Sequence, residues 1–303
     1  MRMKFGVMVF QGGFTYPQIK KFWTEAERLE FDSVWVYDHL INCLEGWTLI
    51  SALAPQTQSI RFGLMVACNS YRHPPLLAKM AATLDIISNG RLEFGIGAGD
   101  MPSEYIAYGY TCPETAVRIA QLEEALRVIK MLWTEDKPTF KGKYYSIKEA
   151  GNEPKPVQKP HPPIWIGSLS GKRLISRVAA LHADVYNVRA WNTADYIKKI
   201  KTLEENCRKV GRNFEDIVKT IHVDFVIART KSKIKEKLED YARYRGIPID
   251  EAEKVCLHGT PDMIAENVKD YVDLGVEAMI LCFQPNKRLE DLYLWAEVVD
   301  QFK

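Results

Sequence analysis

The residue pair best suited to acid–base chemistry is Asp38-His39, which follows the apolar run at 34–37. An imidazole exchanges protons near neutral pH, and a nearby carboxylate can fix its tautomer. Neighbouring residues of a strand point to opposite faces, so the two side chains need not touch. A helix-capping aspartate beside a packed histidine would explain the same pair structurally. We take Asp38 and His39 as catalytic candidates.

A second candidate segment is rich in glycine and reads Gly95-Ile-Gly97-Ala-Gly99-Asp100. A dinucleotide-binding fingerprint would need glycine where Asp100 stands, so the pattern argues against one. Glycines in a strand allow close approach by a flat ring or by other backbone. Gly97 and Gly99 are therefore candidates for contact with a cofactor, and Asp100 is a third acidic candidate for catalysis.

A third segment combines small residues with a cation ahead of a predicted helix. Small residues at a helix start can cradle a phosphate group, although the spacing here is not that of a P-loop. An ordinary strand-to-helix loop is the alternative. The candidate phosphate-binding residues are Gly167, Ser168, Leu169, Ser170, Gly171 and Lys172. By contrast, Thr260-Pro261 is adequately explained as the cap and first residue of a helix.

The elements that must position these residues alternate between short apolar runs and longer helical patterns. Continuous runs rich in valine and isoleucine are typical of parallel strands covered on both faces. The predicted strands are Lys4–Val9, Ser33–Tyr37, Arg61–Ala67, Arg91–Ile96, Ile164–Ile166, Ala183–Asn187, Ile217–Ile227 and Ala278–Cys282. The predicted helices are Pro17–Glu30, Thr48–Thr57, Pro75–Ile87, Ala116–Leu132, Lys172–Leu181, Ala194–Lys209, Pro261–Leu274 and Leu289–Phe302.

Eight such units predict an α/β protein with a single (β/α)₈ TIM barrel over residues 1–303. An open doubly wound sheet is the alternative. Two insertions interrupt the rhythm, after the fourth and seventh strands. Pro138–His161 contains a predicted hairpin, and Arg229–Lys254 is a charged helical segment that is either a lid or a solvated surface helix.

Composition excludes several other classes of protein. The net charge of +2 gives no reason to expect nucleic acid or a membrane as a partner. No apolar run approaches the roughly 18 residues of a membrane span. The six cysteines form no C-x-x-C pair, which favours a reducing, cytoplasmic location, and the six histidines lack the close spacing of a metal site. We expect no metal and a small-molecule substrate.

Several short motifs in order resemble one known family. They include Tyr37-Asp-His39, the stretch Arg72-His-Pro-Pro, the stretch Leu84-Asp-Ile-Ile-Ser-Asn-Gly90-Arg91, the glycine-rich segment above, and Glu104-Tyr105-x-Ala-Tyr-Gly109. Together they resemble the luciferase-like family of FMN-dependent monooxygenases and of enzymes that use the deazaflavin coenzyme F₄₂₀. The resemblance covers most of the chain and is densest from Tyr37 to Asn187.

The resemblance implies a (β/α)₈ barrel with a flavin-like ring across the carboxyl-terminal mouth. It implies that His39 lies near the reacting atom, and that Met65, Val66 and Asn69 border the ring, with a non-proline cis peptide near Met65-Val66. It also implies a phosphate site at residues 167–172 and, commonly, a homodimer. Two departures concern the cofactor: Asp100 replaces a common tryptophan, and the phosphate loop lacks the usual Gly-Gly-x-Gly.

The function that we predict is an F₄₂₀-dependent oxidoreductase that transfers hydride between the cofactor and a small organic substrate, with His39 exchanging the proton. The anionic tail of F₄₂₀ would draw on Lys172, Arg173 and the lysines that begin the Arg229–Lys254 segment. An FMN-dependent monooxygenase is the first alternative. A non-catalytic flavin-binding barrel is the second, because a fold does not prove activity.

Overall fold

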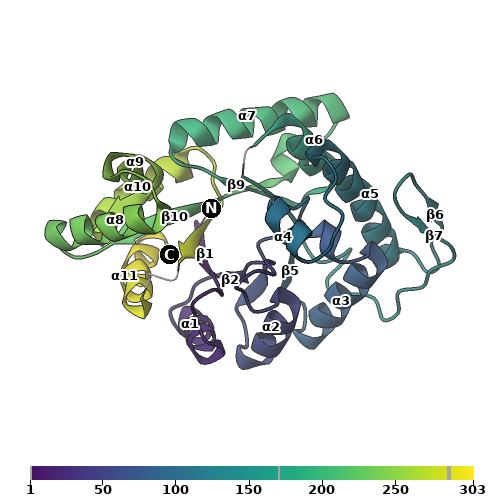
Figure 1. The fold of residues 1–303 in the computed structure, drawn as a ribbon, viewed down its shortest axis with the longest axis horizontal. Coiled ribbons are helices and arrows are strands. Elements are labelled where there is room, and N and C mark those ends of the chain that lie inside the picture. The colour runs from purple at the N-terminus through teal and green to yellow at the C-terminus, as the bar shows by residue number, and fades with distance from the viewer. Residues whose placement is uncertain (1, 170, 285–287) are drawn as a thin grey trace.

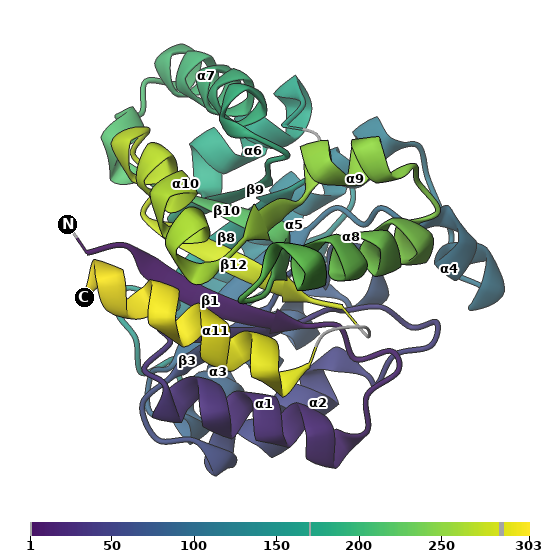
Figure 2. The same ribbon diagram turned by 90° about the vertical axis from the view of Figure 1, so that its left-hand side faces the viewer.

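Eight parallel strands close into a barrel in the computed structural model, which describes residues 2–169, 171–284 and 288–303. Figures 1 and 2 show the strands surrounded by helices. The order around the barrel follows the chain, and pairing between β9 and β10 completes the circle. The strands are β1 (Lys4–Val9), β2 (Ser33–Val36), β3 (Arg61–Leu64), β5 (Leu92–Gly97), β8 (Ile164–Ser168), β9 (Val185–Arg189), β10 (Val218–Ile227) and β12 (Ala278–Phe283).

Helices lie outside the strands and return the chain from one strand to the next. The main ones are α1 (Tyr16–Arg28), α2 (Gly46–Leu53), α3 (Pro74–Ile87), α5 (Thr115–Thr134), α6 (Arg173–His182), α7 (Thr193–Val210), α10 (Pro261–Asp273) and α11 (Leu289–Val299). The first strand pairs with the last, β1 with β12, so both ends of the chain contribute to one core. Within the described residues, no helix combines the length and the apolar character needed to cross a membrane.

The sequence explains why the barrel has two apolar surfaces. Every residue of β12 is buried, as expected of a strand that faces helices outside and packed side chains inside. The interior includes Trp35 and Trp165, whose ring centroids lie 4.6 Å apart. The helix starts follow local chemistry: the side chain of Thr260 accepts a hydrogen bond from the N–H of Met263, and Pro261 follows it as the first helical residue.

The predicted eight-stranded barrel is confirmed, and the open sheet is excluded. The predicted hairpin is also confirmed, as the antiparallel pair β6 (Phe140–Lys141) and β7 (Ser146–Ile147). The predicted third strand is divided into β3 and a short β4 (Ala67–Cys68), because the chain bulges at Met65-Val66. This bulge places side chains of the third strand at the barrel mouth.

The segment predicted as one helical insertion, Arg229–Lys254, forms two helices, and a short strand follows it. These are α8 (Lys231–Arg245), α9 (Ile249–Val255) and β11 (Leu257–Gly259), which extends the sheet by pairing with the end of β10. The two helices share a small apolar cluster with the end of β10. A further short helix, α4 (Pro102–Ala107), was not predicted, since six residues are too few to show helical periodicity.

Candidate active site

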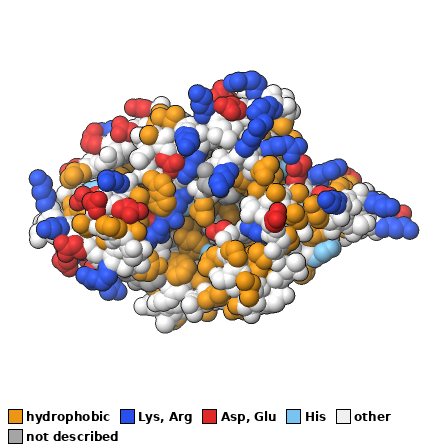
Figure 3. All heavy atoms as spheres, turned by 45° about the horizontal axis from the view of Figure 1, so that its top comes forward, with side chains coloured by type: hydrophobic (Ala, Val, Ile, Leu, Met, Phe, Trp, Pro, Cys, Tyr) orange, Lys and Arg blue, Asp and Glu red, His pale blue; other side chains and the backbone are white. Residues whose placement is uncertain are grey.

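The carboxyl ends of the strands enclose a cavity of about 380 Å³, which opens at the barrel mouth. Figure 3 shows a hollow near the centre of this face, with hydrophobic side chains around much of it. Of the predicted site residues, the cavity walls include Asp38, His39, Met65, Val66, Gly97, Gly99, Asp100, Gly167, Ser168 and Leu169. The end of the barrel predicted to hold the site is therefore the end that carries this cavity.

Val66 forms one wall of the cavity, and two glycines make room for it. The Met65-Val66 peptide is cis, as the family resemblance predicted. A Cβ atom on Gly97 would lie 2.6 Å from Cγ2 of Val66, and one on Gly167 would lie 2.7 Å from its Cγ1. Gly97 and Gly167 thus make room for the side chain of Val66, whereas a Cβ on Gly95 would meet the backbone carbonyl of Leu64 at 2.0 Å. Val66 therefore lines the cavity next to Gly97 and Gly167.

His39 makes a hydrogen bond with Glu104, a residue that we did not predict for the site. Nδ1 of His39 lies 3.1 Å from Oε2 of Glu104. The other carboxylate oxygen accepts the backbone N–H groups of Leu40 and Ile41 at 3.1 and 3.2 Å. Glu104 is fully buried, whereas the side chain of His39 is 21% exposed. The contact therefore links α4 to the loop after β2 and leaves one edge of the imidazole accessible from the mouth.

The hydrogen bonds to Glu104 favour its ionised form. Burial acts to raise the pKa of Glu104, but hydrogen bonds from Tyr71 and from His39 outweigh it and hold the pKa below its ordinary value. The Tyr71 hydroxyl donates to Oε2 at 2.6 Å. Because an ionised carboxylate only accepts hydrogen bonds, Nδ1 of His39 carries the proton and Nε2 has the free lone pair. This arrangement is that of a general base held in one tautomer.

Asp38 has a different environment from the one that its position beside His39 suggested. Its carboxylate accepts two hydrogen bonds from Arg72, at 2.7 and 2.9 Å, and one from the N–H of Cys68 at 2.8 Å. It is buried and makes no hydrogen bond to His39. The geometry supports an anchoring role, in which Asp38 ties the loop after β2 to the bulged third strand.

Asp100 lines the mouth but is exposed and has no hydrogen bond to another described residue. The carboxylate that contacts His39 is therefore Glu104, and a catalytic or substrate-binding role of Asp100 stays a prediction. The sequence did contain a signal for Glu104, because Glu104-Tyr105 belongs to the motifs that carried the family resemblance.

Gly99, a predicted cofactor contact, occupies a position that favours glycine. Its φ is +80°, and a Cβ there would lie 2.1 Å from the Tyr105 hydroxyl.

The predicted phosphate loop leads from β8 into α6 and is fixed internally. The Ser168 hydroxyl accepts the N–H of Gly171 at 2.9 Å. Nζ of Lys199 donates to the carbonyl of Leu169 at 3.1 Å, and its side chain crosses so close to Gly171 that a Cβ would lie 2.3 Å from it. Sequence reasoning missed Lys199, which comes from α7. Lys172 is the N-cap residue of α6, and Ser170 lies outside the described residues.

Two further predicted contributions concern Asn69 and the lysines of α8. Asn69 is buried outside the cavity lining and donates to the hydroxyl of Tyr145, in the hairpin, at 3.2 Å. Two lysines of α8 form ion pairs with neighbouring carboxylates. Lys233 pairs with Glu236, and Lys237 with Asp291 of α11. The supply of charge to the cofactor tail from this segment stays a prediction.

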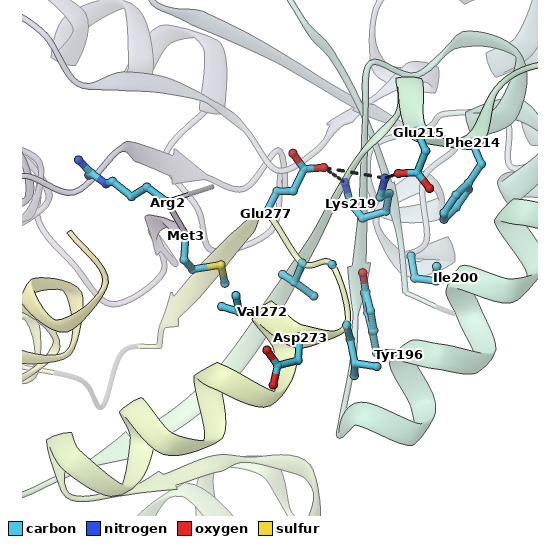
Figure 4. Close-up of a pocket in the computed structure, with 13 residues that line it drawn as sticks. Arg2, Met3, Tyr196, Ile200, Phe214, Glu215, Lys219, Val272, Asp273 and Glu277 are labelled. Atoms are coloured by element: carbon cyan, nitrogen blue, oxygen red, sulfur yellow. Dashed lines mark hydrogen bonds and ion pairs between the residues drawn. The ribbon is translucent and has the colours of Figure 1, made fainter.

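A second cavity, of about 710 Å³, lies at the opposite, amino-terminal end of the strands (Figure 4). Its walls include Met3 before β1 and Lys219 near the start of β10. Nζ of Lys219 lies 3.0 Å from Glu215 and 4.0 Å from Glu277, so its charge is compensated. Chemistry in barrels of this type takes place at the other end. Among the described residues, no cluster of histidine, cysteine or acidic side chains could hold a metal ion.

The fold and the site define a (β/α)₈-barrel protein with a histidine–carboxylate pair at the mouth. A sequence model of the luciferase-like monooxygenase family matches residues 3–252, and the chain belongs to that family. The predicted membership is thereby confirmed.

Two named relatives and one solved structure are similar to most or all of this chain. The chain is 26% identical over 286 residues to a protein of Amycolatopsis mediterranei named F₄₂₀-dependent glucose-6-phosphate dehydrogenase, which covers 84% of this chain and 85% of that protein. It is 28% identical over 311 residues to a protein of the same name from Microbacterium testaceum, covering 92% and 90%. An F₄₂₀-dependent secondary alcohol dehydrogenase, solved with an F₄₂₀–acetone adduct, superposes with a TM-score of 0.89 at 19% identity over the whole of both chains.

Proposed function

We propose that this protein is an F₄₂₀-dependent oxidoreductase that exchanges hydride with a hydroxyl- or carbonyl-bearing small molecule. The observation that carries the proposal is the His39–Glu104 pair at the mouth of the cavity. Relatives that match most of the chain are named for F₄₂₀-dependent dehydrogenation, which supports the choice of cofactor.

The residues of the cavity fit a deazaflavin. A tricyclic ring needs a flat wall, which Val66 offers across Gly97 and Gly167. A phosphate on its side chain needs donors at the start of a helix, which the first backbone N–H groups of α6, from Arg173 onward, can supply. When bound, F₄₂₀ supplies or accepts the hydride. We assign ring contacts to Val66, Gly97 and Gly167 and phosphate contacts to residues 168, 169, 171 and 172, the part of this loop that the structure describes.

The role of His39 is to move the proton that accompanies the hydride. Oxidation of an alcohol releases a hydroxyl proton, and Nε2 of His39 can accept it because Nδ1–H is held by Glu104. The imidazolium that forms is then stabilised by the buried carboxylate beside it. In the reverse direction, the same imidazolium returns the proton to a carbonyl oxygen.

The test is a titration followed by a substitution. We expect the purified protein to bind F₄₂₀ more tightly than FMN when absorbance and fluorescence are followed side by side. His39→Asn should then lower kcat by about 10²–10⁴-fold with little change in the Kd for F₄₂₀. Glucose 6-phosphate and a secondary alcohol are the first substrates to try. Tighter binding of FMN would reject the cofactor assignment, and unchanged turnover of the variant would reject the role of His39.

We also infer a homodimer in the cytoplasm. The homodimer rests on the family resemblance, and the location rests on six cysteines that are all free. Light scattering coupled to size-exclusion chromatography tests the first inference. A mass of a single 34.8 kDa chain at micromolar concentration would contradict it.

A further inference from the structure

A second histidine, His222, lines the same cavity from β10 and has no part in the mechanism above. Its Nδ1 lies 2.8 Å from Oδ1 of Asn187 on the adjacent strand β9. Nδ2 of Asn187 donates in turn to the hydroxyl of Thr220 at 2.8 Å, and that hydroxyl donates to the carbonyl of Tyr186 at 3.3 Å. The three side chains thus form a continuous chain of hydrogen bonds inside the barrel wall.

The direction of this chain determines the tautomer of His222. The carbonyl of Tyr186 can only accept a hydrogen bond, so the Thr220 hydroxyl donates its one proton to it. The same hydroxyl must therefore accept the hydrogen bond from Asn187. The amide nitrogen of Asn187 therefore faces Thr220, and its oxygen faces the imidazole. Nδ1 of His222 must carry the proton that this oxygen accepts, which leaves Nε2 as a lone-pair acceptor.

The surroundings keep the ring uncharged. Burial, with a contribution from the positive charge of Arg189, lowers the pKa of His222 to about 3. A neutral histidine in this tautomer accepts a hydrogen bond through Nε2 and donates none there. No hydrogen bond joins Nε2 to another described residue, although the ring lies against the cavity. A histidine that served only to pack the core would have no need of a fixed polar edge on a binding cavity.

We propose that Nε2 of His222 accepts a hydrogen bond from the ring bound in the cavity, and so selects a ring with an N–H or O–H donor on the edge that enters the barrel. A deazaflavin has two such donors, the imide N–H of its pyrimidine ring and the phenolic O–H at the opposite edge. The assignment rests on the proposed function, but it applies to any flavin-like ring that the cavity accepts. His222 is on this account a specificity-determining residue and takes no part in proton transfer.

The first measurement uses the unchanged protein and needs no substrate. We expect the ¹⁵N resonances of His222 to show Nδ1 protonated and Nε2 unprotonated at neutral pH. Addition of the tail-free deazaflavin with its phenolic hydroxyl should move the Nε2 resonance toward lower frequency, as acceptance of a hydrogen bond does. A protonated Nε2 in the free protein, or an Nε2 resonance that does not respond to a bound ring, would overturn the proposal.

The second measurement identifies the donor. His222→Phe retains a ring but removes the acceptor, and an unpaired buried donor should weaken binding of the phenolic deazaflavin by about 5- to 150-fold. His258→Phe is the control, because His258 lies on β11 and outside the cavity lining. If the imide is the donor, binding of 5-deazariboflavin, which lacks the hydroxyl, should weaken equally. If the phenol is the donor, the affinity of His222→Phe for 5-deazariboflavin should equal that of the unchanged protein.

The outcomes separate this proposal from the proposed function. Should the protein bind riboflavin or FMN in preference to any deazaflavin, F₄₂₀ dependence fails, while the same titrations with riboflavin still test His222 through the imide. Should deazaflavins bind and His222→Phe, shown by circular dichroism to be folded, bind both rings as tightly as the unchanged protein, the role of His222 fails and F₄₂₀ dependence stands.

Discussion

Replacing Glu104 with glutamine tests whether the buried carboxylate sets the state of His39. One carboxylate oxygen accepts the N–H groups of Leu40 and Ile41, so the amide oxygen of Glu104→Gln should take that place. The amide NH₂ would then face His39 and donate to Nδ1. That contact requires the opposite tautomer, with the proton on Nε2, where a base must be free to accept one.

The size of the effect follows from two losses. A hydrogen bond to a charged group contributes about 1.5–3 kcal/mol, and Glu104→Gln removes it from the imidazolium; this alone is about 10- to 150-fold in rate. The wrong tautomer must also be reversed before reaction. We therefore expect kcat to fall by about 10²–10⁴-fold, within the usual range for loss of general-base help, while the Kd for F₄₂₀ changes little.

The assay measures kcat in steady state and the Kd for F₄₂₀ by titration, for Glu104→Gln and for the control Asp100→Asn. Asp100 lines the mouth without a hydrogen bond to His39, so its substitution also removes one negative charge near His39 but should leave the tautomer unchanged. The ¹⁵N resonances of His39 supply a readout that is independent of substrate, and we expect them to exchange their protonation pattern in Glu104→Gln only. Turnover of Glu104→Gln within about twofold of the unchanged protein would refute this reasoning.

Three further predictions concern stability and packing. Burial lowers the pKa of His182 to about 4, so the unfolded chain takes up its proton first. The free energy of unfolding should fall by up to about 3 kcal/mol as pH is lowered from 6.5 to 4, and urea titrations of His182→Gln should show a shallower decline. Gly97→Ala would place a methyl group 2.6 Å from Val66, which should cost about 1–3 kcal/mol and weaken ring binding; an unchanged Tm would contradict this. Arg72→Met would leave Asp38 buried without its partner and should cost about 3–5 kcal/mol in urea unfolding, against the 0–1 kcal/mol of an exposed pair.

The barrel could be predicted from the sequence because its strands and helices are local patterns. Each predicted strand overlaps an observed one, since a strand buried on both faces appears as a continuous apolar run. The errors arose where tertiary contacts decide the ends of elements. The third strand stops at Leu64 because the chain bulges at Met65-Val66, and α4 is stabilised by the contacts of its Glu104 with the loop after β2.

The candidate site was only partly predictable, because its important contacts join distant parts of the chain. His39 could be found from its place at the end of a predicted strand. Its partner Glu104 lies 65 residues later on a six-residue helix, and Asp38, the nearer acid in sequence, bonds to Arg72 instead. Lys199 similarly reaches the carbonyl of Leu169 from 30 residues away. Proximity in sequence is therefore a poor guide to which carboxylate orients a catalytic histidine.

Two histidines line the same cavity, and their different hydrogen-bond partners suit them to different roles. In both His39 and His222, Nδ1–H donates to a side-chain oxygen, so each presents Nε2 as an acceptor. Glu104 is an anion and stabilises a positive imidazole, whereas Asn187 is neutral and offers no such compensation. In the proposed mechanism, His39 therefore gains a proton during the reaction. His222, buried and close to Arg189, is built to remain neutral, so it can accept a hydrogen bond from a bound ring without competing for the substrate's proton.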